Sequence, residues 1–139
     1  NEEYNFADGQ VTRSWGTATP RRLEDEDAVD EDGENVLDEE GNQVINYGLK
    51  TEKKRIIKQQ ASGLLEKTDW HNHKALDDDT YTIPDNIKTY RANVRAKSNE
   101  METQIDACNN VDELKALYEY TTQEDGTQTR PLAEFPEEI

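Results

Sequence analysis

The sequence predicts a mainly α-helical fold: a small helical hairpin with a third short helix, preceded by an extended acidic arm that can include a short β-hairpin. Two stretches, residues 51–70 and 83–97, carry apolar side chains at steps of three and four residues, which is helical spacing. Hydrophobic residues make up 32% of the chain and the mean hydropathy is -1.15. Because globular domains are usually roughly 45–50% apolar, we expect a small core and segments that become ordered only against a partner.

The 139 residues divide into an extended, partner-ordered arm (1–50), a helical domain (51–121) and an extended C-terminal tail (122–139). Residues 1–50 hold 14 acidic and 4 basic groups. The net charge of -16 disfavours nucleic acid and anionic membranes as partners, since both surfaces are negative. No apolar run approaches the roughly 20 residues of a membrane-spanning helix. The chain begins with Asn1 rather than Met, so we expect the numbering to start inside a longer product or after a processing cut.

The first 22 residues show no sustained period, yet they contain large apolar side chains, among them Tyr4, Phe6 and Trp15. We interpret these three as partner-binding residues that bury on a neighbouring subunit or on the hairpin, at roughly 1.5–3 kcal/mol each if fully buried. The alternative is a floppy terminus with incidental aromatic residues.

The acidic stretch from Leu23 to Val44 contains an internal echo, because residues 30–36 are matched eight residues later by residues 38–44. Each copy carries a glycine in a turn-forming context. Short β segments, 36–37 and 43–45, can flank the second turn as a small hairpin.

A calcium loop is the specific alternative for these carboxylates, so its spacing can be tested. An EF-hand loop needs acidic ligands at positions 1, 3 and 5, Gly at 6 and Glu at 12. With Gly33 at position 6, position 1 is Ala28, and with Gly41 at position 6, position 1 is Val36. Both alignments fail at the first ligand. A solvated acidic spacer is the preferred interpretation, with a weak cation site of another kind as the alternative.

The helical hairpin is predicted to bury one apolar stripe from each helix. Trp70 closes the stripe of the first helix, and its indole is expected to cap the core. The single cysteine, Cys108, continues the stripe of the second helix and is expected to be a small buried apolar side chain. The predicted hairpin core is Ile57, Leu64, Leu65, Trp70, Ile87, Tyr90 and Val94.

Between the helices, His71 and His73 precede three aspartates, residues 77–79, which suggests a zinc or manganese site. Histidines two apart in a turn need not converge, so we prefer a structural loop and assign no metal ligand and no cofactor.

A third short helix is predicted from Asn110 as its N-cap to an end near Thr121, because Glu113 three residues after Asn110 completes a capping-box-like arrangement. Residues 124–126 form a turn, and two prolines keep residues 130–136 extended. Leu132 and Phe135 are candidate partner-binding residues, with docking back onto the hairpin as the equal alternative.

The chain shows no activated Ser or Cys pattern, no phosphate-binding Gly loop and no paired metal motif, so we assign no catalytic residue and expect a protein that is not an enzyme.

A set of short motifs in the helical stretch carries a resemblance to a known family over residues 54–95, about a third of the chain. The motifs are Arg55, Leu64-Leu65, Thr68-Asp69-Trp70, Ile83-Pro84, Tyr90-Arg91 and Val94-Arg95. In these positions the chain is similar to the C-terminal domain of bacteriophage tail-fibre assembly and tail assembly chaperone-like proteins. Where the family usually has a second Trp before Tyr-Arg, this chain has residues 87–89, Ile-Lys-Thr.

The resemblance implies a non-enzymatic protein of a bacteriophage tail, a structural or interaction component of the virion that is present in the host cytoplasm during assembly. Its partners would be other phage structural proteins, such as tail, fibre or neighbouring subunits, in an oligomeric assembly. A transient tail or tail-fibre assembly chaperone, absent from the mature particle, is the alternative. A calcium-responsive acidic binding module is the third.

Overall fold

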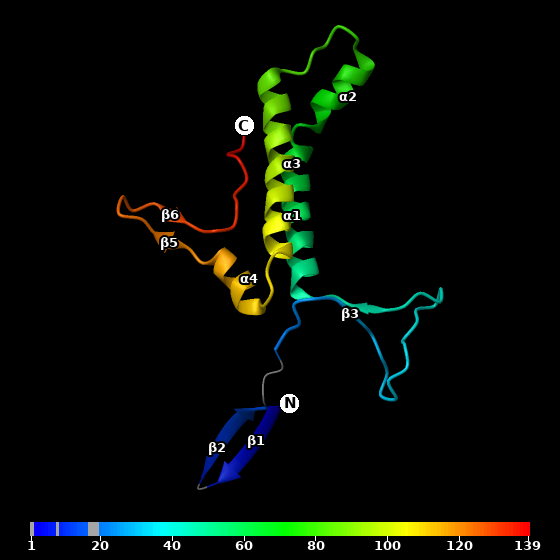
Figure 1. Cartoon of the computed structure of the whole chain (residues 1–139), viewed down its shortest axis with the longest axis vertical. Helices are drawn as coiled ribbons and strands as arrows, with labels where there is room; N and C mark the ends of the chain where they lie inside the picture. Colours follow the sequence, from blue (N-terminus) through cyan, green and yellow to red (C-terminus); the bar gives the residue numbers. More distant parts are fainter. Residues whose placement is uncertain (1, 8, 17–19) are drawn as a thin grey trace.

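A computed structural model describes residues 2–7, 9–16 and 20–139 of the chain. Figure 1 shows a long pair of antiparallel helices, α1 and α3, from which the other segments extend. The chain is mainly α-helical with small sheets, each an antiparallel pair of strands. In chain order the elements are β1 (Glu2–Ala7), β2 (Gln10–Trp15), β3 (Glu26–Asp27), β4 (Ile45–Asn46), α1 (Leu49–Glu66), α2 (Asp69–Asp77), α3 (Asp85–Asp106), α4 (Val111–Tyr118), β5 (Thr121–Thr122) and β6 (Gln128–Thr129).

The core lies along the α1–α3 contact as two apolar clusters. The first contains Ile57 and Cys108 together with Met101, Ile105, Leu114 and Leu132. The second contains Tyr90 and Val94 with Ala61, and Leu64, Leu65 and Phe135 pack against it half-buried. Of the predicted core residues, Ile57, Tyr90 and Val94 are therefore buried, and Ile87 is half-buried.

The connection between α1 and α3 differs from the predicted loop, because it contains the helix α2. The first helix ends at Glu66, and α2 starts at Asp69 after a break at Thr68, whose hydroxyl donates to the carbonyl oxygen of Leu65 at 3.0 Å. The prediction for Trp70 assumes one continuous helix through residue 70, and this break changes the direction in which its side chain points. The prediction that Trp70 caps the core is wrong: its side chain is 54% exposed, and its ring stacks on His71 with 3.7 Å between the centroids.

The third predicted helix corresponds to α4, and its start agrees with the sequence signal. The side-chain oxygen of Asn110 accepts a hydrogen bond from the backbone N–H of Glu113 at 2.9 Å. The Glu113 carboxylate accepts from the backbone N–H of Asn109 at 2.7 Å, one residue before the position a capping box uses. The helix ends at Tyr118 rather than near Thr121, and a turn with Gly126 at φ 84° joins β5 to β6.

The C-terminal segment lies against the helices instead of extending away as a tail. The Gln104 side chain donates to the carbonyl oxygen of Pro131 at 2.9 Å and accepts from the N–H of Ala133 at 2.8 Å. Leu132 is 2% exposed, and its N–H donates to the carbonyl oxygen of Leu117 at 3.0 Å. Phe135 is half-buried and contacts both clusters. The tail is therefore part of the helical unit.

The acidic arm folds into a three-cornered unit, residues 26–46, in which the spacing of the eight-residue echo extends back to Ala28. Ala28, Val36 and Val44 are eight residues apart, and their backbones form a closed ring. Val36 donates to Ala28, Val44 donates to Val36, and Ala28 donates to Val44, at 2.8–2.9 Å. The pairs Val29–Asn35 and Leu37–Gln43 close two corners, and the β3–β4 pair closes the third. The predicted hairpin over residues 36–45 is thus one corner of this unit.

Residues 2–7 and 10–15 form a β-ribbon, in a stretch whose sequence shows no sustained period. Strands β1 and β2 pair antiparallel, with Tyr4 opposite Arg13 and Phe6 opposite Val11. Gly9 supplies the positive φ of 77° that such a tight turn requires. Among the described residues, the ribbon packs against no other helix or strand, and Figure 1 shows it beyond the N-terminal end of α1.

Candidate interaction surface

A buried arginine joins the three helices of the hairpin end, and it connects the motifs that carry the family resemblance. Arg91 of α3 is 7% exposed. Its guanidinium donates to the carbonyl oxygen of Leu65 at 2.8 Å and to the Thr68 hydroxyl at 2.7 Å, and it pairs with the Asp69 carboxylate at 2.8 Å. We call these four residues the Arg91 latch. The Thr-Asp and Tyr-Arg motifs therefore have a structural role: they hold the α1–α2 turn against α3.

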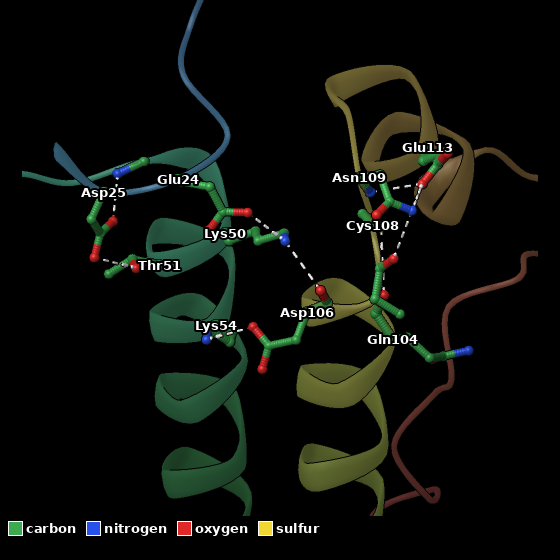
Figure 2. Close-up of polar contacts among 12 residues, drawn as sticks. Glu24, Asp25, Lys50, Thr51, Lys54, Gln104, Asp106, Cys108, Asn109 and Glu113 are labelled. Carbon is green, nitrogen blue, oxygen red and sulfur yellow. Dashed lines mark hydrogen bonds and ion pairs between the residues drawn. The ribbon is translucent and has the colours of Figure 1, made fainter.

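At the opposite end of the hairpin, the acidic arm is attached to α1 by the arm root, residues 24, 25, 48, 50 and 51 (Figure 2). The Asp25 carboxylate accepts from the N–H of Gly48 at 2.7 Å and from the Thr51 hydroxyl at 2.9 Å. Lys50 pairs with Glu24 at 2.6 Å and donates to the carbonyl oxygen of Asp106 at 3.1 Å. A side chain at position 48 would place its Cβ 2.3 Å from the Glu24 carbonyl oxygen, so the close approach requires glycine. The arm thus leaves the helices from a fixed point.

A second contact at this end brings α1 and α3 together. Lys54 pairs with the Asp106 carboxylate at 2.7 Å. This hydrogen bond raises the pKa of the Lys54 amine above its usual value, so the amine is charged at neutral pH. Nearby, burial raises the pKa of the Cys108 thiol. Because the thiolate is the reactive form, Cys108 is a packing residue here and a poor nucleophile.

The β-ribbon has one apolar face and one polar face. In an antiparallel pair, residues directly opposite one another lie on the same face. Tyr4, Phe6, Val11 and Arg13 share one face by this register, and the other face carries Asn5 and further polar residues of β2. Phe6 is 74% exposed and Val11 66% exposed. The ribbon therefore presents large apolar side chains to solvent.

Two carboxylates of the three-cornered unit accept hydrogen bonds from the backbone of their own turns. In one corner, an Asp38 oxygen accepts from the N–H groups of Glu40 and Asn42 at 2.9 and 2.8 Å. Asp30 makes the equivalent contacts in the corner before it. The hydrogen bond from Asn42 lowers the pKa of Asp38. Residues 26–46 contain nine acidic and no basic residues, so this unit is strongly negative.

An apolar groove lies between the start of α1 and α4. It has a volume of about 240 Å³ and is lined by Leu49, Lys53, Val111, Leu114, Lys115 and Tyr118. Val111 is 41% exposed. The Lys53 amine lies over the Tyr118 ring at 5.0 Å, and Lys115 pairs with Glu119 at 3.6 Å. The groove is thus an apolar surface with two cations on its rim.

His71, one of the residues that suggested a metal site at the hairpin turn, makes a structural contact. His71 is buried, and its Nδ1 lies 2.5 Å from the Tyr81 hydroxyl. The Lys74 amine lies over the Tyr81 ring at 4.4 Å. Over residues 2–7, 9–16 and 20–139, no group of three His, Cys, Asp or Glu side chains has an arrangement that would hold a metal ion.

The five predicted partner-binding residues have different surroundings. Tyr4 and Phe6 are exposed on the ribbon. Trp15 lies at the end of β2, and its side chain is outside what the structure describes. Leu132 is buried in the first core cluster, so assigning it to partner binding is wrong; of the two alternatives for this residue, docking onto the hairpin is observed. Phe135 is only half-buried on the same helices.

Sequence reasoning missed the ribbon, the Arg91 latch and the groove. The Asp8-Gly9 dipeptide is a strong hairpin signal, and the alternation around it would have predicted the ribbon. The latch and the groove had no comparable signal, because each is assembled from elements far apart in the sequence.

Comparison with known proteins identifies no relative: no family model matches, and neither the curated proteins nor the solved structures contain a match. Within the described residues, no helix is long and apolar enough to cross a membrane.

Proposed function

We propose that this chain is a non-enzymatic interaction component of a bacteriophage tail, retained in the virion. In this proposal the helical unit is a scaffold and the N-terminal ribbon is the element that binds neighbouring phage structural proteins. The resemblance of residues 54–95 to tail assembly chaperone-like proteins supports the phage assignment. The residues of that resemblance include Thr68, Asp69 and Arg91, and the buried Arg91 contacts both of the others, as expected for a motif that maintains a fold.

The observation that carries the proposal is the exposed apolar face of the ribbon. Phe6 and Val11 lie side by side across the two strands and are 74% and 66% exposed. An isolated two-stranded ribbon is at best marginally stable in water, and exposed apolar surface of this kind commonly marks a protein-binding site. A partner that covers this face would stabilise the ribbon and bury both side chains.

Quantitative mass spectrometry of purified phage particles tests the proposal. Copies of the chain in a fixed ratio to known tail proteins are the expected result. A chain that is abundant in infected cells and absent from particles would instead identify a transient assembly chaperone and contradict the proposal.

A matched pair of variants links the result to the ribbon. Phe6→Ser removes an exposed aromatic ring from the ribbon, whereas Leu76→Ser removes an 80% exposed side chain from α2. We expect Phe6→Ser to reduce incorporation into particles and Leu76→Ser to leave it unchanged, at equal cellular levels. Equal incorporation of both variants would exclude the ribbon as the binding element.

A further inference from the structure

The exposed apolar face of the ribbon and the apolar α1–α4 groove lie at the same end of the molecule. The groove includes Leu49, the first residue of α1. The N–H of Leu49 donates to the carbonyl oxygen of Arg22 at 2.9 Å, so the chain that leads to the ribbon leaves the helices beside the groove. Figure 1 shows α4 and the exit of the N-terminal segment together at the base of the α1–α3 hairpin.

Both surfaces are apolar, and their charges are opposite. The ribbon projects Phe6 and Val11, and the groove has space of about 240 Å³ between apolar side chains. Residues 2–15 carry three acidic groups and one basic group, while Lys53 and Lys115 stand at the rim of the groove. The acidic arm, with 11 acidic and no basic residues over 23–49, would repel the ribbon, so the groove is more favourable for it than the arm on electrostatic grounds.

The ribbon does not reach the groove of its own chain. In the described residues it packs against no helix. The segment that follows the ribbon contacts α1 through the Arg21–Glu52 ion pair at 2.5 Å and the Arg22–Leu49 backbone hydrogen bond. From this fixed exit the ribbon extends away from α4 (Figure 1).

We infer that the groove binds the ribbon of a second copy of this chain, and that two copies exchange ribbons in a closed dimer. This inference deepens the proposed function and rests on it, since it names one of the neighbouring subunits. Because ribbon and groove share one end of the molecule, two copies that meet base to base satisfy both contacts at once, as a two-fold symmetric interface requires.

The expected dimer is weak. Standard stable interfaces bury about 1,200–2,000 Å², and here two small contacts must overcome the repulsion between two chains of net charge -16. At 0.15 M salt this long-range repulsion is largely screened. We therefore expect the dimer only at high protein concentration, and a covalent trap is the appropriate test.

Cysteine crosslinking of the full chain distinguishes the possible occupants of the groove. Phe6→Cys and Val111→Cys are made in separate chains with different tags, mixed under mild oxidation and resolved on non-reducing gels. We expect a disulfide-linked heterodimer of twice the 16.0 kDa chain mass, with the 6–111 crosslink confirmed by mass spectrometry. The native Cys108 is buried, and the unmodified chain, which contains it, gives the background level of crosslinking.

Two controls make the result specific. In the first control, Leu76→Cys takes the place of Val111→Cys. Leu76 is 80% exposed and lies on α2 at the other end of the hairpin, so this pair should give no crosslink above background. Lys115→Glu should slow the 6–111 crosslink about threefold or more, whereas Lys97→Glu on α3 should not change it. Circular dichroism verifies that each variant is folded.

Three outcomes would overturn the inference. A double variant with both cysteines that gives only an internally crosslinked monomer would show that the ribbon binds in its own chain. Equal crosslinking at positions 76 and 111 would show random collision, and no crosslink at all would show that another molecule or nothing fills the groove. None of these outcomes concerns the presence of the chain in phage particles, so the proposed function is tested separately.

Discussion

At the scale of single residues, polar side chains with several simultaneous partners determine how the elements meet. The Arg91 guanidinium contacts Leu65, Thr68 and Asp69 at once and is almost fully buried. Gln104 acts in a similar way on the C-terminal segment, since its amide both donates and accepts a backbone hydrogen bond. A fork of donors such as guanidinium suits this role, because one side chain can satisfy several acceptors in a fixed geometry.

Replacing Arg91 tests the latch. Arg91→Ala leaves the Leu65 carbonyl and the Thr68 hydroxyl without this donor and removes the partner of Asp69. The free energy of unfolding, measured by urea denaturation, should fall by about 2–4 kcal/mol. Arg95→Ala, one helical turn later and exposed, should change it by less than about 0.5 kcal/mol. Similar effects of the two substitutions would contradict the structural role of the latch.

The start of α4 should respond to acid. The hydrogen bond from the backbone N–H of Asn109 lowers the pKa of Glu113. A carboxyl group whose pKa is lowered by folding stabilises the folded state above its unfolded pKa, and this contribution is lost as the pH falls through the folded pKa. The cap should therefore be intact at neutral pH and weaken below about pH 4. Carboxyl chemical shifts of Glu113 measured against pH check this, and a midpoint above the ordinary value of glutamate would refute it.

At the scale of elements, the helical unit depends on segments that the sequence alone would leave outside it. The C-terminal segment contributes Leu132 to the first core cluster, and Leu23 and Leu49, which flank the acidic arm, pack against the same cluster. The domain boundaries at residues 50 and 121 therefore cut through contacts of the core. The ribbon, by contrast, packs only within itself in the part of the chain that the structure describes.

Leu132→Ala tests whether the C-terminal segment is part of the core. The Leu132 side chain is 2% exposed, and shortening it leaves a cavity in the core, so the free energy of unfolding should fall by about 2–5 kcal/mol. Leu76→Ala, on an 80% exposed side chain, is the matched control and should be close to neutral. A small effect at position 132 would mean that the segment detaches in solution.

Hydrogen exchange tests the independence of the ribbon. At dilutions where the chain is monomeric, the amides of β1 and β2 should exchange far faster than those of α3, because a two-stranded ribbon opens without disturbing the core. For the same reason Phe6→Ser should leave the midpoint of thermal unfolding unchanged. Ribbon amides as protected as those of α3 would show that the ribbon is packed on the helices.

At the scale of the whole molecule, the charge distribution separates an acidic arm from a helical unit with a basic first helix. Residues 50–58 of α1 carry five basic groups and one acidic group, and the arm root pairs one of them, Lys50, with Glu24. The carboxylates of the three-cornered unit are exposed to solvent, so the repulsion among them opposes compaction and is weakened by salt.

Calcium provides the test at this scale. In the described corners, Asp30 and Asp38 accept hydrogen bonds from their own turns. We therefore expect no shift in the unfolding midpoint when sub-millimolar calcium is added in 0.15 M sodium chloride. Raising sodium chloride itself should raise the midpoint through screening. A calcium-specific rise would favour the third alternative, a calcium-responsive acidic module.

The sequence by itself determined the features that depend on neighbours along the chain. Helical spacing identified Ile57, Tyr90 and Val94 as core residues, and cap chemistry identified Asn110 as the start of α4. The glycine turns of the acidic arm were likewise readable. Each of these signals acts within one turn or one helix, where residue type and spacing are sufficient.

Only the tertiary structure decided which faces meet. It exposed Trp70, because the break at Thr68 changed the helical phase, and it buried Leu132 by docking the C-terminal segment on α3 and α4. It also closed Ala28, Val36 and Val44 into a ring. These outcomes depend on contacts between residues that are distant in sequence. The free energy of such contacts is set by the packing of whole elements, so local sequence patterns do not predict it.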